Sequence, residues 1–233
     1  MKKKIIILVS VMMTIFFIGC DKQISISSKN GEFTGTYENG TPEDFNREPD
    51  ISELKFFEDI SEAILANNFS EDLSAINVKK IIKILEKDDD CIVFFVTQEV
   101  DKDMFYIYKM KEKSENNKKY YSTPILAGGW QWEDKKNWSK QLESSTDESE
   151  WFSEKVESDL MLFNGSDVFT LGNDKIKIKW GLSIDENIKK LKINGVSPTE
   201  IMNIKLDDDD VYFWYYEGLD VNHSNISETK ITF

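Results

Sequence analysis

The chain has 233 residues, with 29 Lys and Arg against 43 Asp and Glu, which gives a formal net charge of -14 at pH 7. Such an acidic chain opposes phosphate backbones, so the composition argues against nucleic acid as a partner. With 40% hydrophobic and 12% aromatic residues, the chain can form one large or two small globular domains.

The first twenty residues predict a bacterial export signal that ends in a cysteine. Three lysines at residues 2–4 precede an apolar run over residues 5–18, which is too short to span a bilayer. Residues 17–20, Phe-Ile-Gly-Cys, resemble the lipobox of bacterial lipoproteins, although Phe17 stands where that family usually has leucine. The resemblance implies that residues 1–19 are removed and that the thiol of Cys20 carries the lipid. The alternative is an ordinary secretory signal, or an uncleaved anchor, with Cys20 present by chance.

Residues 20–50 are expected to form the lipidated cysteine and a flexible tether, because they are polar and interrupted by glycine and proline. Loss of the three lysines of the signal would bring the net charge of the mature chain to about -17. Anionic headgroups would repel such a body, so the diacylglyceryl group on Cys20 would hold the protein at the extracytoplasmic face of the cell membrane. Abundant Lys, Asn and Ile with a single arginine, Arg47, favour a low-GC Gram-positive source.

The chain has two cysteines, Cys20 and Cys91. Lipidation of Cys20 would leave no pair for a disulfide within the chain. Cys91 begins the apolar run Cys-Ile-Val-Phe-Phe-Val, which predicts a buried, unreactive thiol.

Residues 51–132 predict a helix packed on an antiparallel β-meander. Apolar residues at helical spacing predict a helix over 51–67, and the β-branched and aromatic run Cys91–Gln98 predicts a buried strand. The segment 79–87 fits a helix or a strand, and we expect it to form a hairpin with the buried strand. Residues 104–110 and 120–127 predict two more strands of the meander.

Residues 133–166 are predicted to connect this unit to a β-rich unit over 167–233, and 151–163 fit a helix or a strand. Six short strands are expected in the second unit, over 168–171, 175–180, 188–193, 199–204, 211–216 and 229–233. Strands at this spacing are typical of a small β-sandwich. The predicted fold class is therefore α+β, with a helix on a β-meander followed by a small β-sandwich-like unit.

The order of these features resembles uncharacterised small lipoproteins of Bacillus-like bacteria. The resemblance rests on the lipobox, the tether, the Ile-Val-Phe-Phe strand, Gly-Gly-Trp-Gln-Trp at residues 128–132 and Tyr-Phe-Trp at residues 212–214. These are packing and turn motifs, so the resemblance implies a location and an architecture and no activity.

The sequence has few residues that could carry catalysis. His223 is the one histidine and fits an exposed loop, and no phosphate-binding glycine motif occurs. One histidine and one unlipidated cysteine cannot supply a usual zinc ligand set. We therefore expect no catalytic residue, no cofactor and no metal. The alternative is a carboxylate-dependent envelope hydrolase of glycan or peptide, since a glycosidase needs only two carboxyl groups, about 5–9 Å apart.

The acidic run Asp207–Asp210 could supply oxygen ligands for a calcium ion, and Asp88–Asp90 is a second acidic run. Adjacent residues cannot all point toward one ion, and the spacing of an EF-hand loop is missing. Solvated turns between strands are therefore the favoured interpretation of both runs.

Three tryptophans are the candidate ligand-binding residues: Trp130, Trp132 and Trp214. Exposed aromatic rings could bind a cell-wall saccharide or an envelope protein, whereas burial of the same rings would make them core residues. For Trp214 the core interpretation is favoured, because it lies in an aromatic strand. We therefore predict a noncatalytic binding or accessory module of the cell envelope.

Overall fold

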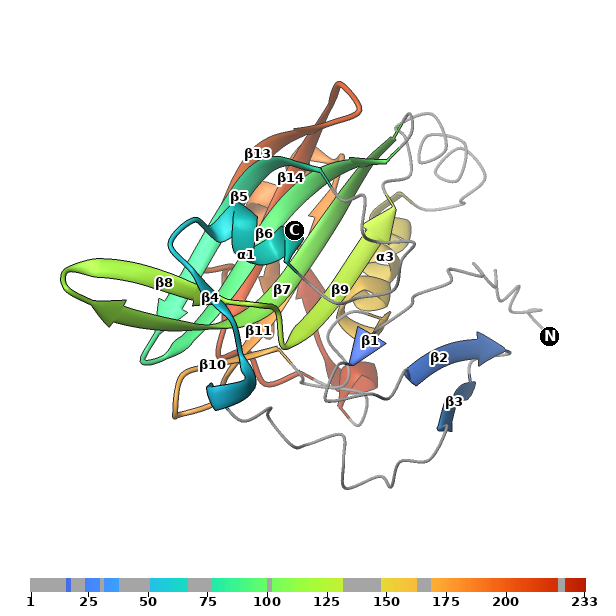
Figure 1. Cartoon of the computed structure of the whole chain (residues 1–233). Coiled ribbons are helices and arrows are strands. Elements are labelled where there is room, and N and C mark those ends of the chain that lie inside the picture. The colour runs from blue at the N-terminus through green and yellow to red at the C-terminus, as the bar shows by residue number, and fades with distance from the viewer. Residues whose placement is uncertain are drawn as a thin grey trace.

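The computed structural model describes residues 16–17, 24–29, 32–37, 51–66, 77–99, 102–131, 148–162, 169–221 and 225–233. Over these ranges the protein is mostly antiparallel sheet with few helices (Figure 1). The predicted antiparallel architecture is therefore confirmed at this level.

The first sheet has seven strands, and its main path runs in the order β1-β9-β7-β6-β5, with β8 paired to β7 and β4 paired to β8. Its strands are β1 (Phe16–Phe17), β4 (Phe56–Phe57), β5 (Val78–Lys87), β6 (Asp90–Glu99), β7 (Lys102–Glu115), β8 (Lys118–Ser122) and β9 (Leu126–Gln131). The segment left open between helix and strand is β5, and it forms the expected hairpin with β6. Asp88, in the turn, adopts a positive φ of 55°, which a short acidic side chain tolerates.

The single helix expected over 51–67 is wrong. The chain there forms a 3-10 turn, η2 (Ile51–Glu53), then β4, and only then a short helix, α1 (Ile60–Leu65). The Asp59 side chain accepts hydrogen bonds from the N–H groups of Ser61 and Glu62, so the helix begins after Asp59. Burial of Ala63 and Ile64 places α1 against the outer face of the first sheet.

The second sheet has four strands in the order β10-β11-β14-β13. These are β10 (Thr170–Leu171), β11 (Ile176–Ser183), β13 (Glu200–Leu206) and β14 (Asp209–Glu217), and a separate pair is formed by β12 (Lys192–Ile193) and β15 (Ile231–Thr232). The first half of the strand expected over 188–193 is a 3-10 turn, η4 (Glu186–Lys190), and only β12 at its end is a strand. The turn begins there because the Asp185 side chain accepts a hydrogen bond from the N–H of Asn187.

A fifteen-residue helix, α3 (Glu148–Leu162), resolves the element left open at 151–163. It lies on the second sheet, with its closest contacts to β11, β15 and the 3-10 turn η5 (Ile226–Glu228). Part of the predicted connecting segment 133–166 is therefore a packed helix. The predicted tether 20–50 contains a hairpin of β2 (Ile24–Lys29) and β3 (Glu32–Tyr37).

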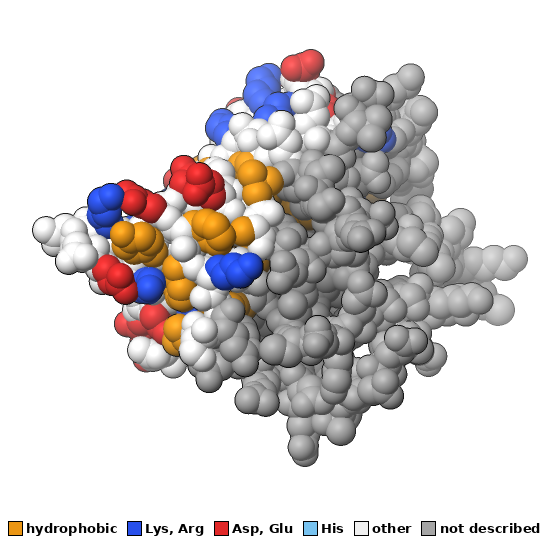
Figure 2. All heavy atoms as spheres, in the orientation of Figure 1, with side chains coloured by type: hydrophobic (Ala, Val, Ile, Leu, Met, Phe, Trp, Pro, Cys, Tyr) orange, Lys and Arg blue, Asp and Glu red, His pale blue; other side chains and the backbone are white. Residues whose placement is uncertain are grey.

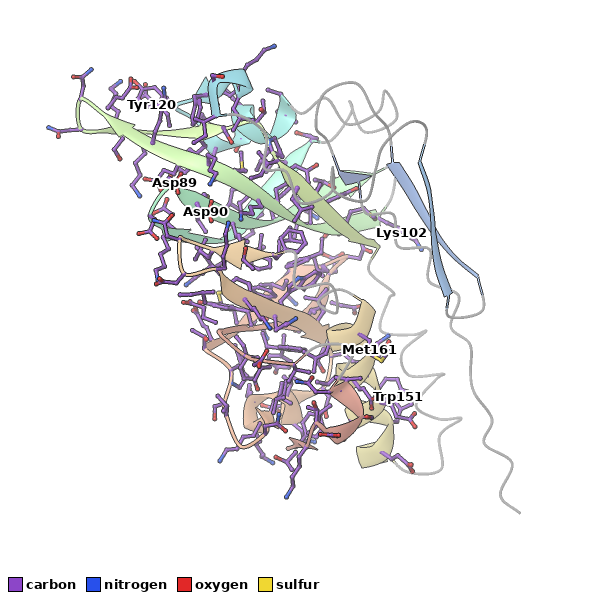
Figure 3. All side chains as sticks on the ribbon, turned by 90° about the horizontal axis from the view of Figure 1, so that it is seen from below. Asp89, Asp90, Lys102, Tyr120, Trp151 and Met161 are labelled. Carbon is purple, nitrogen blue, oxygen red and sulfur yellow. The ribbon has the colours of Figure 1, made fainter. Side chains whose placement is uncertain are left out.

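The two sheets share one apolar core. Figure 3 shows them as adjacent layers, with α1 outside the first and α3 beside the second. The shared cluster takes Phe94 and Phe105 from the first sheet and Trp180, Phe213 and Tyr215 from the second, and the rings of Phe94 and Phe213 lie 4.8 Å apart. The sandwich predicted inside residues 167–233 is therefore built from both predicted units. The division into two folding units at 51–132 and 167–233 stays a prediction.

Candidate functional site

The structure does not bring the three candidate tryptophans together. Trp214 is 0% exposed and packs with Tyr216 and with Val156 of α3 on the outer face of the second sheet. Trp130 lies on β9, where its backbone is opposite Phe105 of the first sheet, and Trp132 lies outside the described residues. Trp214 is therefore a core residue in this structure, as the favoured interpretation held.

Two other candidate residues, Cys20 and His223, also lie outside the described residues. Cys91 is buried and reduced on β6, and burial, with the charges of Glu86 and Glu112 nearby, raises the pKa of its thiol well above the ordinary value. The prediction of a buried thiol is confirmed. A thiol held in its neutral form is a poor nucleophile.

Four polar side chains meet at the outer face of the first sheet, and we call them the carboxyl cluster: Glu86, Glu112, Lys119 and Tyr121. Strand register assembles them, because Glu86 of β5 is opposite Cys91 of β6, and Glu112 of β7 is opposite Tyr121 of β8. Lys119 Nζ donates to Glu86 and lies 3.3 Å from Oε1 of Glu112, and Tyr121 Oη donates to Glu86 over 3.2 Å.

The two carboxyl groups of the cluster differ in their pKa values. Burial alone would raise the pKa of Glu86, but the hydrogen bond and charge of Lys119 outweigh it and bring the pKa below its ordinary value. Burial raises the pKa of Glu112, and the negative charge of Glu86 adds to the effect. Burial also raises the pKa of Tyr121 to about 12. The cluster therefore separates the pKa values of its two carboxyl groups, with that of Glu86 below and that of Glu112 above the ordinary value.

The spacing of the carboxyl cluster does not suit glycoside hydrolysis. Glu86 and Glu112 both contact the same Nζ atom of Lys119, whereas the two carboxyl groups of a glycosidase stand about 5–9 Å apart with room between them for the sugar or a water. Lys119 also occupies the space beside both groups. In this arrangement Lys119 of β8 neutralises the carboxyl groups of β5 and β7. The cluster therefore favours a structural role over general acid–base catalysis. Sequence reasoning could not find the pair, since its members are 26 positions apart along the chain and meet only through the register.

The acidic run Asp88–Asp90 connects the two sheets instead of forming a fully solvated turn. Asp90 is 2% exposed; its Oδ1 lies 2.7 Å from Lys111 Nζ, and its Oδ2 accepts a hydrogen bond of 2.9 Å from the N–H of Gly172. Figure 3 places Asp90 where the first sheet meets the second. Asp88 accepts a second hydrogen bond, of 2.8 Å, from the N–H of Asn173. For Asp90 the predicted solvated state is therefore wrong, because the turn of β10 and β11 covers it.

The run Asp207–Asp210 makes a similar contact at another hairpin. The N–H of Asp103 donates to Asp207 Oδ1 over 2.7 Å, and the N–H of Asp207 donates to Asp103 Oδ2 over 2.9 Å. Lys79 neutralises Asp103 at 2.7 Å. Asp207 and Asp103 therefore fasten the β13–β14 hairpin to the start of β7, which accounts for this part of the acidic run without a metal.

The described surface offers little else that resembles a site. Over the face formed by α1, β4 and β8, apolar side chains lie between acidic and basic ones (Figure 2). Among the described residues no group of three or more His, Cys, Asp and Glu side chains is arranged to hold a metal ion. In the same part of the chain, no helix has the length and apolar character needed to cross a membrane.

Comparison with known proteins found no match: the chain matches no protein-family model, no curated protein and no solved structure. The resemblance to small lipoproteins therefore stays a prediction from the sequence.

Proposed function

We propose that this protein is a lipoprotein of the bacterial cell envelope, anchored at the extracytoplasmic face of the membrane, that acts as a noncatalytic binding or accessory module. The observation that carries the proposal is the sequence of residues 2–20, with its basic start, short apolar core and Gly19-Cys20. Two acyl chains on Cys20 suffice for stable anchoring, whereas one chain binds a membrane only reversibly.

The electrostatics of the body support a role away from the lipid surface. The chain carries far more Asp and Glu than Lys and Arg, so anionic headgroups would repel the folded part. The predicted tether of residues 20–50 would let this part stand clear of the membrane. Its partner would then be a cell-wall saccharide or an envelope protein, with Trp130 and Trp132 as the candidate contact residues.

The use of buried charge supports a noncatalytic role. Asp90 and Asp103 bind lysines and backbone N–H groups that join the two sheets. The carboxyl cluster binds its own lysine in the same way. Charges engaged in this way stabilise the fold and are not free to accept a substrate proton.

Metabolic labelling tests the anchor. Cells expressing the full chain are grown with an alkyne fatty acid, and the protein is isolated and coupled to a fluorophore. The wild type should be labelled and should remain in the membrane fraction. Cys20→Ala should be unlabelled, because the thiol that carries the lipid is gone.

Cys91→Ala is the matched control, since Cys91 is the one other cysteine and is buried. It should be labelled as strongly as the wild type. Equal labelling of wild type and Cys20→Ala would refute the lipoprotein proposal. Loss of label in Cys91→Ala alone would show that the lipid is attached to Cys91 and not to Cys20.

A further inference from the structure

Helix α3 covers the outer face of the second sheet through a mixed interface. Val156 and Leu160 pack in one apolar cluster with Trp214 and Tyr216 of β14. Figure 3 shows the helix beside this sheet, with Trp151 and Met161 labelled along it. The aromatic side chains beneath it are inaccessible while the helix is docked.

One carboxyl group of α3 points into this interface. Asp159 is only 4% exposed, and a Cβ atom built on Gly181 of β11 would lie 2.5 Å from its Oδ2. The same Cβ would lie 2.2 Å from Cζ2 of Trp214. Gly181 therefore leaves the space that the carboxyl group occupies, and the backbone of Leu182 supplies a hydrogen bond to it.

The charged groups around Asp159 come from two elements. Lys155 lies one turn earlier on α3, and on β11 the buried Lys179 shares the face of Gly181. In η5 the one titratable residue is Glu228, which is exposed, and β15 has none. Burial outweighs the positive charge of Lys155 and the Leu182 hydrogen bond, and it raises the pKa of Asp159 to about 7.

We propose that α3 is a pH-responsive cover, docked firmly on the second sheet when the Asp159 carboxyl group is protonated and loosened when this group ionises. Released into water, the carboxyl group loses its proton near pH 3.8, whereas the docked group keeps it until about pH 7. Docking is therefore strongest below pH 3.8, weakens as the pH rises from there, and stops weakening above about pH 7. Loosening would uncover Trp214 and Tyr216, and a protein at the outer face of a cell would meet external pH directly.

Hydrogen exchange of the mature chain in detergent tests the proposal. Mass spectrometry follows peptides from residues 148–162 at pH 5.5 and pH 8, with each rate corrected for intrinsic exchange. The two pKa values predict that the opening constant of α3 rises about 30-fold between these pH values. Peptides from β6 serve as the internal reference and should not show this rise.

Two variants identify the group. Asp159→Asn keeps the shape of the side chain and should make α3 protection independent of pH over this range. Glu154→Gln changes an exposed carboxyl group of the same helix and should behave as the wild type. The proposal would be overturned if the opening constant of α3 in the wild type did not change between pH 5.5 and pH 8, or if it rose as much in Asp159→Asn as in the wild type. A wild-type response that keeps rising above pH 8 would assign the titration to another group.

Discussion

Replacement of Trp214 by alanine should destabilise the protein by about 3 kcal/mol. The ring is fully buried, so its removal forfeits roughly 150–250 Å² of buried area, worth about 4–6 kcal/mol at about 25 cal/mol per Å². Among the described residues no group accepts a hydrogen bond from its indole N–H. A buried donor without an acceptor destabilises the wild type by about 1–3 kcal/mol, so its removal offsets part of the lost burial.

Urea unfolding followed by circular dichroism measures this free energy, and sedimentation with purified peptidoglycan measures wall binding on the same samples. Trp151→Ala is the control, because Trp151 is a half-buried tryptophan of α3 and should cost about 1 kcal/mol. A Trp214→Ala protein that keeps wild-type stability and loses peptidoglycan binding would refute the core assignment. It would then make Trp214 a binding residue.

Two further substitutions test the contacts that the structure assigns. Asp90→Asn should cost about 3–5 kcal/mol in urea unfolding, because it removes the buried carboxylate that lies 2.7 Å from Lys111 and 3.4 Å from Lys109. Asp89→Asn, with a side chain 48% exposed and 3.5 Å from Lys111, should cost less than about 1 kcal/mol. Equal costs would contradict the inter-sheet contact. Gly181→Ala should cost about 1–3 kcal/mol by crowding Trp214, and less when Trp214 is also shortened to phenylalanine. Additive costs in the double variant would show that the two residues do not interact.

The sequence predicted the strands well because their signals are local. The apolar run Cys91–Gln98 lies within β6, and the aromatic run at 211–216 lies within β14. Asp88-Asp89 and Asp207-Asp208 are turns in the structure, as their sequence indicates. Helix lengths were less predictable, since the side chains of Asp59 and Asp185 set where helical turns begin.

The sandwich and its polar contacts could not be read from the chain, because both depend on which strands meet. Phe94 and Phe213 are 119 positions apart, and nothing local indicates that their sheets face each other. The same holds for Asp90 and Gly172, whose hydrogen bond exists only once the sheets are packed. In the sequence, Asp159 resembles any exposed helix residue, and only the packing of α3 over Gly181 shows that its side chain is buried.

The shared core adds a test to the predicted division of the chain into two folding units. Limited proteolysis should cut first in residues 20–50 and next in 133–147, as their polar composition indicates. A cut in 133–147 should leave the two halves associated, because the core they share is apolar. Early cleavage inside 91–110 would contradict the division.

The mass of the mature protein tests the central claim most directly. Protein purified from membranes should lack residues 1–19 and begin at a Cys20 that carries a diacylglyceryl group, with Cys91 unmodified. Alkaline hydrolysis should cleave the two glyceryl esters and release the acyl chains, and the glyceryl group should stay on Cys20 through its thioether. A chain that retains residues 1–19, or one cut at another residue and free of lipid, would contradict the assignment of this protein as a lipoprotein.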